Sequence, residues 1–188
     1  GSGPRRQDGI TFLLIDMDSA GLSVRPIVSI AGEHEFNEVV FDQVSVPVAN
    51  RVGEEHQGWA AAKLLMRFAR SNNTTSGLLR RAMRRARSLW DDAGGDERAT
   101  FALRLSALDC ELRAFEATEL RALSSAGPDG ISGEQSSMMK TLATELHQKI
   151  TEFMLDAAGP MANGSVASSQ FAARKYLETR AASIYSGT

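Results

Sequence analysis

The stretch FNEVVFDQVSVPVANRVGEEHQGW, residues 36–59, decides the fold because its hydrophobic pattern changes partway along. From Glu38 to Val46, apolar side chains occupy alternate positions, as on a strand with one buried face, and a shift near Asp42 is typical of a β-bulge. Pro47 has no backbone N–H to donate, so we expect it to end this strand. Beyond it the alternation stops and helical spacing takes over. The stretch therefore marks a switch from sheet to helix.

Upstream of this switch the sequence predicts two further strands. Ile10 to Ile15 is a short β-branched and aromatic run that favours a buried strand, and Leu22 to Ile27 alternates until Pro26 ends it. No helical period separates these runs, so the strands are expected to be antiparallel, and three strands alone would be marginally stable. We therefore interpret residues 1–53 as the C-terminal part of an incomplete β-domain.

Downstream of the switch, residues 54–188 predict four helices with short links, packed as an antiparallel bundle. The first expected helix is Trp59–Trp90, weakened by the polar run 71–77, and the second is capped by Asp96 and stopped by Gly127-Pro128. The third has a Ser132/Gln135 capping box and is stopped by Ala158-Gly159-Pro160. The fourth is Gln170–Tyr185, capped by Ser168 or Ser169. The fold class is therefore mostly α, with a short antiparallel β segment in front of the bundle.

Two polar features of the first predicted helix allow more than one interpretation. The small side chains of residues 71–77 could pack against a neighbouring helix or form the wall of a ligand cavity. The basic run of Arg80, Arg81, Arg84, Arg85 and Arg87 has spacing typical of a solvated helix face. We expect that solvated face in preference to an anion site.

Composition excludes several classes of function. The 188 residues contain 21 Lys and Arg against 23 Asp and Glu, a net charge of -2 that gives no reason to expect nucleic acid as a partner. The single Cys110 cannot form an internal disulfide, which favours a cytoplasmic location, and no Cys/His cluster has the spacing of a metal site. The sequence contains no run of about 18 apolar residues, the length that a helix needs to span a membrane.

Generic catalytic motifs are also absent from the sequence. His34, His56 and His147 each have a neighbourhood typical of a solvated or structural role, and Cys110 lies in an amphipathic stripe, where we expect a small apolar filler. No nucleophile elbow, phosphate loop or zinc-binding helix motif occurs. The residues alone thus predict a β segment joined to a helical bundle, without an evident reaction.

A resemblance to a known family adds a function. Residues 36–59 resemble the F-x-E-V-x-F-D-x-V-x-V-P and V-G-E-x-x-x-G-W segments of the acyl-CoA dehydrogenases, and ITFLLIDMDSAGLSVRP, residues 10–26, is similar to a hairpin of their middle domain. LDAAGPM, residues 155–161, and RAASIYSGT, residues 180–188, resemble the family's L-G-P-x-G turn and its R-A-x-x-I-Y-x-G-T loop. The chain thus resembles the end of the family's middle β-domain followed by its C-terminal helical domain without the last helix.

The resemblance implies an oxidoreductase of lipid metabolism that uses FAD. Family members are usually tetramers that oxidise an acyl-CoA to the trans-2-enoyl-CoA and pass electrons to an acceptor. A glutamate removes the α-proton while the β-hydrogen leaves as hydride to the flavin. The resemblance places Gly187 and Thr188 at the FAD, and Tyr185 and Ser186 at the thioester end of the substrate.

The sequence departs from the family at the catalytic base. One family position for the glutamate follows the tyrosine of the I-Y-x-G-T loop, and here Ser186 stands there. The other lies on the first helix of the bundle, where alternative alignments give Ala69 or Arg67. No acidic residue occurs between Glu55 and Asp91, so neither alignment supplies a base.

Three explanations follow from this departure. The one we favour is a subunit of a hetero-oligomeric dehydrogenase, an arrangement known for bulky substrates such as sterol side-chain thioesters, in which a partner subunit carries the base. The second is an active enzyme whose base comes from another position, and the third is a non-catalytic structural or binding subunit of the same fold. A flavin monooxygenase of this fold is a further, minor interpretation.

Overall fold

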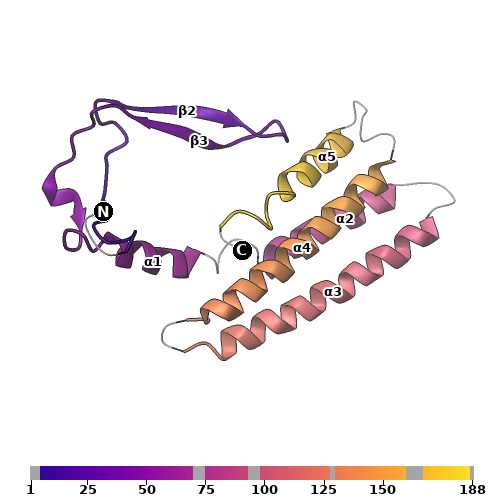
Figure 1. Cartoon of the computed structure of the whole chain (residues 1–188). Helices are drawn as coiled ribbons and strands as arrows, with labels where there is room; N and C mark the ends of the chain where they lie inside the picture. Colours follow the sequence, from indigo (N-terminus) through magenta and orange to yellow (C-terminus); the bar gives the residue numbers. More distant parts are fainter. Residues whose placement is uncertain (1–4, 70–74, 93–97, 128–129, 160–166, 187–188) are drawn as a thin grey trace. The chain divides into compact units, whose positions relative to one another are not determined.

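The computed structural model describes residues 5–69, 75–92, 98–127, 130–159 and 167–186 (Figure 1). Its strands are β1 (Phe12–Leu13), β2 (Leu22–Val28), β3 (His34–Phe41) and β4 (Arg51–Val52), with a short 3-10 helix at Val48–Asn50. Its helices are α1 (Gly58–Ala69), α2 (Ser76–Asp92), α3 (Arg98–Ser124), α4 (Gly133–Ala158) and α5 (Ala167–Thr179). The predicted fold class, mostly α with an antiparallel β segment before a helical bundle, is confirmed.

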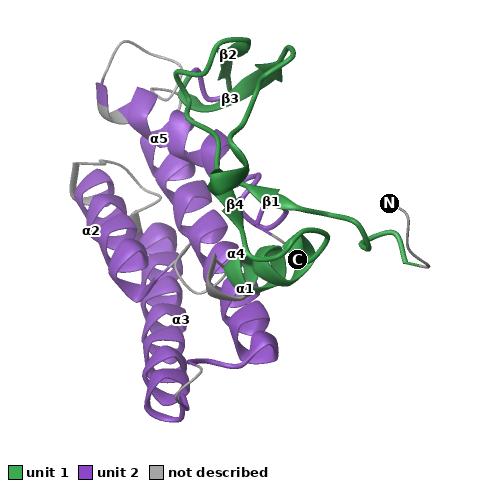
Figure 2. Cartoon of the chain, turned by 90° about the vertical axis from the view of Figure 1, so that its left-hand side faces the viewer, with its two compact units in different colours: residues 1–29, 33–69 green, residues 30–32, 70–188 purple. Residues whose placement is uncertain are grey.

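The chain divides into two compact units (Figure 2). The first contains residues 1–29 and 33–69, and therefore the strands together with α1. The second contains residues 30–32 and 70–188, and therefore α2 to α5. The domain boundary expected between residues 53 and 54 stays a prediction.

The strands of the first unit form two small antiparallel pairs. β2 pairs with β3, with Leu22 opposite Phe41, and β1 pairs with β4, with Phe12 opposite Val52. Pro26 does not end its strand as expected, because β2 continues to Val28 with Pro26 opposite Asn37. Within the described part of the chain, β3 is the one strand hydrogen-bonded to β2, so the other side of β2 is open there, and an open side can accommodate a residue that lacks an N–H.

The third predicted strand ends earlier than its alternating sequence pattern indicated. β3 ends at Phe41, whereas we expected a strand up to Val46. The backbone of Gln43 is left-handed, with φ 52, which breaks the extended conformation just beyond the strand. The bulge expected near Asp42 is not there, because β3 has already ended; the register irregularity of this hairpin lies between Ile27 and Val28.

The first predicted helix is two helices. α1 ends at Ala69 and α2 begins at Ser76, while residues 70–74, which include most of the polar run, lie outside the described residues. Thr75 is not helical, and its carbonyl accepts hydrogen bonds from the N–H groups of Leu78 (3.0 Å) and Leu79 (3.1 Å) at the start of α2. The expectation of one long helix from Trp59 to Trp90 is therefore wrong.

The second unit is a four-helix bundle built around α4, which packs against α2, α3 and α5. The buried core draws on every helix of the bundle: Leu79, Met83, Ala86 and Leu89 of α2, Leu105, Leu108, Leu112 and Phe115 of α3, Ala143, Leu146, Ile150, Phe153 and Met154 of α4, and Ala172 of α5. These residues recur at spacings of three and four, so each helix buries one stripe.

The ends of the last two helices show where local signals hold and where they do not. The Ser132/Gln135 capping box is present, and α4 ends at Ala158 before Gly159, whose φ of 58 suits glycine. α5 begins at Ala167, before both serines expected to cap it, and ends at Thr179 instead of Tyr185. The predicted cap Asp96 lies outside the described residues.

The described residues lack two features that would bear on function. No helix in them is long and apolar enough to cross a membrane. In the same part of the chain, no group of three or more His, Cys, Asp or Glu side chains is arranged to hold a metal ion.

Candidate functional site

The segment Arg180–Ser186, called here the C-terminal loop, follows α5 and folds into tight turns. The N–H of Ala182 donates to the carbonyl of Thr179 (3.1 Å), and the N–H groups of Ile184 (2.9 Å) and Tyr185 (3.0 Å) both donate to the carbonyl of Ala181. Such turns leave several carbonyls without a helical partner, and the bundle must supply donors for those that are buried.

Lys140 of α4 is one of those donors. It is only 5% exposed, and its ammonium group donates to the carbonyl of Tyr185 at 2.5 Å and lies 3.5 Å from the carbonyl of Ser183. A buried ammonium group is costly unless it is hydrogen-bonded, and carbonyl oxygens are its partners here. Lys140 therefore fixes the path of the C-terminal loop near Tyr185.

Gln148, two turns further along α4, holds the start of the loop. Its side-chain amide donates to the carbonyl of Thr179 (3.0 Å) and to the hydroxyl of Ser183 (3.1 Å). Arg180 returns the contact, because its guanidinium donates to the carbonyl of Gln148 (3.0 Å) and to the hydroxyl of Thr151 (3.2 Å). Side chains of α4 and backbone groups of the loop thus satisfy one another.

These anchors were missed by sequence reasoning, although a signal for them exists. Lys140, Thr144, Gln148 and Thr151 recur on α4 at spacings of four, four and three, the same period as the apolar stripe, although Thr144 bonds back to carbonyls of its own helix and does not contact the loop. Lys140, Thr144 and Thr151 are buried. A polar stripe with helical period beside an apolar one indicates a helix face that binds backbone groups of another segment.

The loop presents two of the predicted site residues. Tyr185 is 52% exposed, and its neighbour Ile184 is 74% exposed. Ser186 is exposed and has a left-handed backbone with φ 60, a conformation that is uncommon for serine. Gly187 and Thr188, the predicted cofactor contacts, lie outside the described residues.

The alternative base positions lie elsewhere in the chain. Ala69 and Arg67 belong to α1, in the first unit, and their side chains are outside what the structure describes. Neither residue has a carboxylate. The loop position is occupied by the hydroxyl of Ser186, which is far too weak an acid to be ionised near neutral pH.

The histidines and the cysteine take no part in this site. His34 and His56 are exposed in the first unit, while His147 of α4 is half-buried, and burial lowers its pKa to about 4, so it is neutral near pH 7. Cys110 is exposed, so its interpretation as a small apolar filler is wrong.

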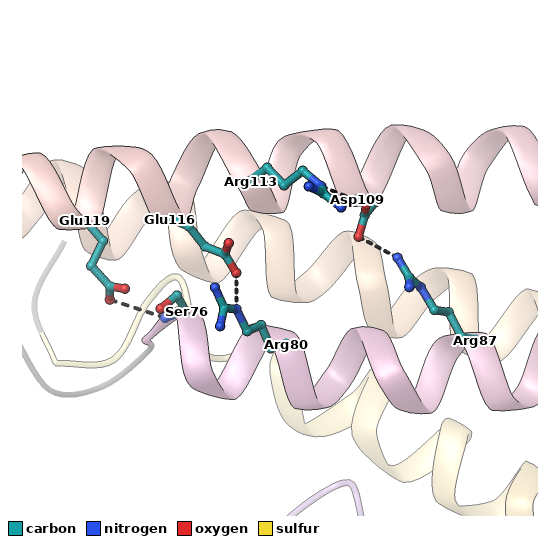
Figure 3. A network of polar contacts seen from close by, with 7 residues as sticks. All are labelled: Ser76, Arg80, Arg87, Asp109, Arg113, Glu116 and Glu119. Carbon is teal, nitrogen blue, oxygen red and sulfur yellow. Dashed lines mark hydrogen bonds and ion pairs between the residues drawn. The ribbon is translucent and has the colours of Figure 1, made fainter.

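The basic run of α2 is exposed, as expected for a solvated face, and two of its arginines also join α2 to α3 (Figure 3). Arg80 pairs with Glu116, and Arg87 pairs with Asp109 at 2.6 Å. The hydrogen bond from Arg80 holds the pKa of the Glu116 carboxyl below its ordinary value, so that side chain stays ionised. These pairs are contacts between helices.

Comparison with known sequences connects this loop and bundle to one family. The acyl-CoA dehydrogenase C-terminal domain profile matches residues 56–188. Acyl-CoA dehydrogenase IpdE1 of Mycobacterium tuberculosis is 32% identical over 200 residues, which cover 99% of this chain and 49% of that protein. The chain therefore spans about half the length of this relative.

Solved structures share the fold. The Tcur3481-Tcur3483 steroid ACAD has a TM-score of 0.84 at 19% identity, covering 100% of this chain and 50% of that chain. The ChsE4-ChsE5 complex from Mycobacterium tuberculosis has a TM-score of 0.79 at 23% identity, with the same coverage of 100% and 50%. At these identities the likeness concerns the fold alone.

Proposed function

The chain belongs to the acyl-CoA dehydrogenase family, and on that premise we propose that it is part of an FAD-dependent dehydrogenase subunit that lacks the usual catalytic glutamate. The enzyme would oxidise an acyl-CoA to the trans-2-enoyl-CoA. In this proposal residues 1–53 complete a middle β-domain and residues 54–188 form most of the C-terminal helical domain.

The observation that carries the proposal is the serine at position 186 on an anchored, family-type loop. Lys140 and Gln148 hold the loop from α4, so its conformation is built into the bundle. Ser186 stands where the family's loop carries a glutamate, and residues 56–90 contain no carboxylate that could replace it from the first helices. Removing an α-proton requires a base in its ionised form, which a serine hydroxyl does not provide near neutral pH.

A partner subunit is therefore expected to supply the base. We propose a hetero-tetramer of related subunits in which this chain contributes its fold and its half of the interfaces, in preference to a homo-tetramer. Support comes from two similarly folded structures whose names pair two proteins, ChsE4-ChsE5 and Tcur3481-Tcur3483. The steroid named in the second favours a bulky acyl group as the substrate.

The C-terminal loop also fits the family's cofactor in the part that is described. When FAD is bound to a member of this family, it supplies the acceptor for the hydride that leaves the β-carbon of the substrate. The side chains of Ile184 and Tyr185 are exposed, and in the sequence they shortly precede Gly187 and Thr188, the residues proposed to contact FAD. Tyr185 and Ser186 would line the thioester end of the substrate, where they can orient the acyl group but not deprotonate it.

The same missing carboxylate favours a second candidate function. A subunit of this fold without a base could be a non-catalytic structural or binding component of a hetero-oligomer. In both cases we propose a cytoplasmic location. The two candidates differ in whether this subunit binds FAD and an acyl-CoA in its own site.

The test uses the protein at its full natural length, expressed alone and then together with homologous subunits that carry the glutamate. Bound FAD is measured by its absorbance, and its bleaching by acyl-CoA is followed without oxygen. We expect FAD binding without bleaching by the protein alone, and bleaching once a partner is present. Bleaching by the protein alone would show that it has its own base, and a chain that never binds FAD would favour the non-catalytic subunit.

A further inference from the structure

The arginines of α2 lie in two different environments. Arg80 and Arg87 point to α3, where Glu116 and Asp109 neutralise them (Figure 3). Arg81 and Arg84 make no ion pair within the described part of the chain, and Arg85 lies over the ring of Phe171, 4.9 Å from its centroid. One side of α2 is therefore compensated by carboxylates, and the other side is cationic.

The cationic side of α2 borders a groove of about 700 Å³ between α2, α4 and α5. Phe171 of α5, Met154 of α4 and Ala82 of α2 give it apolar walls, and Arg81, Arg84 and Arg85 line the same space. Its volume is in the range of small-molecule sites, which typically combine mostly apolar walls with a few charged groups.

The remaining ionisable groups in the groove do not cancel the positive charge. His147 on the α4 side is neutral near pH 7 because burial lowers its pKa to about 4. Glu178 of α5 is already paired with Lys175 of the same helix. The groove therefore presents the charge of three arginines beside apolar walls, a layout that suits a molecule with a negatively charged head and an apolar body.

We propose that this groove binds an organic anion with an apolar body, whose carboxylate or phosphate lies among Arg81, Arg84 and Arg85 and whose body packs on Phe171 and Met154. Guanidinium groups bind both carboxylate and phosphate oxygens through charge-assisted hydrogen bonds, and they retain their charge at any ordinary pH. The proposal concerns the bundle itself and does not depend on the reaction proposed above.

The experiment measures binding to the protein at its full natural length by titration calorimetry. The probes are dodecanoate and dodecyl phosphate, each below its micelle concentration, together with dodecyltrimethylammonium and inorganic phosphate as comparisons. We expect saturable one-to-one binding of an anionic amphiphile and much weaker binding of the cationic one. The two anionic probes distinguish a carboxylate ligand from a phosphorylated one. Higher salt should weaken binding, since the arginine side chains are exposed.

Variants assign the binding to the groove. Replacing both Arg81 and Arg84 by Gln should weaken the binding of the anionic amphiphile by at least roughly tenfold. The matched control replaces Arg113 and Arg121 of α3 by Gln, which removes the same charge from outside the groove and should leave affinity unchanged. Ser88→Trp adds bulk to an exposed position in the groove lining and should also weaken binding, with all arginines retained. Circular dichroism checks that each variant is folded.

Three results would overturn the proposal. Equal binding of the anionic and cationic amphiphiles would show nonspecific hydrophobic adsorption. Equal losses in the groove variant and in the α3 control would show a general effect of net charge. If neither Ser88→Trp nor the Arg81/Arg84 double variant bound the amphiphile more weakly than the wild type, the amphiphile would bind elsewhere on the chain.

Discussion

At the scale of single residues, burial of His147 makes the stability of the bundle depend on pH. Its pKa is lowered to about 4 from an ordinary 6.5, chiefly by desolvation, although Glu178 opposes this effect. The unfolded chain therefore takes up the proton more readily than the folded one. The contribution of His147 is complete above pH 6.5 and is lost as the pH falls through 4.

We expect the wild-type chain to lose on the order of 1 to 2 kcal/mol of unfolding free energy between pH 7 and pH 5 through this residue. Urea unfolding at several pH values measures the loss, and His147→Gln should remove it. His34→Gln, at an exposed histidine, is the control and should keep the wild-type dependence. Parallel pH profiles for the wild type and His147→Gln would contradict this assignment.

Lys140 should have a larger effect than another lysine on the same helix. Lys140→Met removes the donor to the carbonyl of Tyr185, and we expect a loss of about 1–3 kcal/mol of unfolding free energy. Lys149→Met removes an exposed pair with Glu111 and should cost at most about 1 kcal/mol. Urea unfolding compares the two, and amide exchange should accelerate in the C-terminal loop only for Lys140→Met. Similar losses in both variants would mean that Lys140 does not anchor the loop.

Sequence reasoning found the ends of this site but not its support. Tyr185 and Ser186 were located by the family resemblance of the loop, whereas Lys140 and Gln148 lie about 40 residues earlier and contact the loop only through the tertiary fold. Their helical period was visible, but nothing local indicates which backbone groups a buried lysine binds. The interpretation of Cys110 as a filler of an amphipathic stripe also failed, because the side chain lies on the exposed side of α3.

At the scale of elements, α2 is held to the bundle by a buried stripe. Leu79 is 0% exposed in the core, so Leu79→Ala should leave a cavity and cost about 2–5 kcal/mol of unfolding free energy. Leu103→Ala makes the same chemical change at a side chain that is 75% exposed, and it should cost less than about 0.5 kcal/mol. Thermal and urea unfolding measure both variants. A small loss for Leu79→Ala would contradict the packing of α2 described above.

Elements were predicted best where a local signal was specific. The Ser132/Gln135 capping box placed the start of α4 correctly, because both of its hydrogen bonds are made within one turn. The end of α5 was placed too late, since Gln148 binds the carbonyl of Thr179 and Lys140 binds that of Ser183, and these contacts stabilise turns in place of a further helical turn. The predicted strand through Pro26 was too short, because the rule that proline ends a strand holds only for strands that are paired on both sides.

At the scale of the whole molecule, the β segment leaves much apolar surface uncovered. Val28, Phe36 and Phe41 in the β2–β3 pair are 67%, 51% and 56% exposed. A two-stranded ribbon is only marginally stable alone, as the sequence predicted for an incomplete β-domain. The bundle, in contrast, has a continuous core whose apolar stripes were visible as helical periodicity, although periodicity did not reveal the break between α1 and α2 or the end of α5.

Family membership came from ordered motifs, whereas the role that we propose for this chain within the family depends on a single missing carboxylate. Composition and periodicity could not reveal that absence, because a serine in an exposed loop is ordinary in any protein. It became informative only when the loop was matched to a family whose chemistry requires a base at that position.

The most direct test of this account compares the wild type with Ser186→Glu in the flavin-loaded protein at its full natural length. The rate of flavin bleaching by an acyl-CoA is measured without oxygen and without any partner subunit. We predict no bleaching by the wild type and measurable bleaching by Ser186→Glu, which restores a carboxylate at the family's position. Rapid bleaching by the wild type, unchanged in Ser186→Glu, would contradict the claim that this subunit lacks its own base.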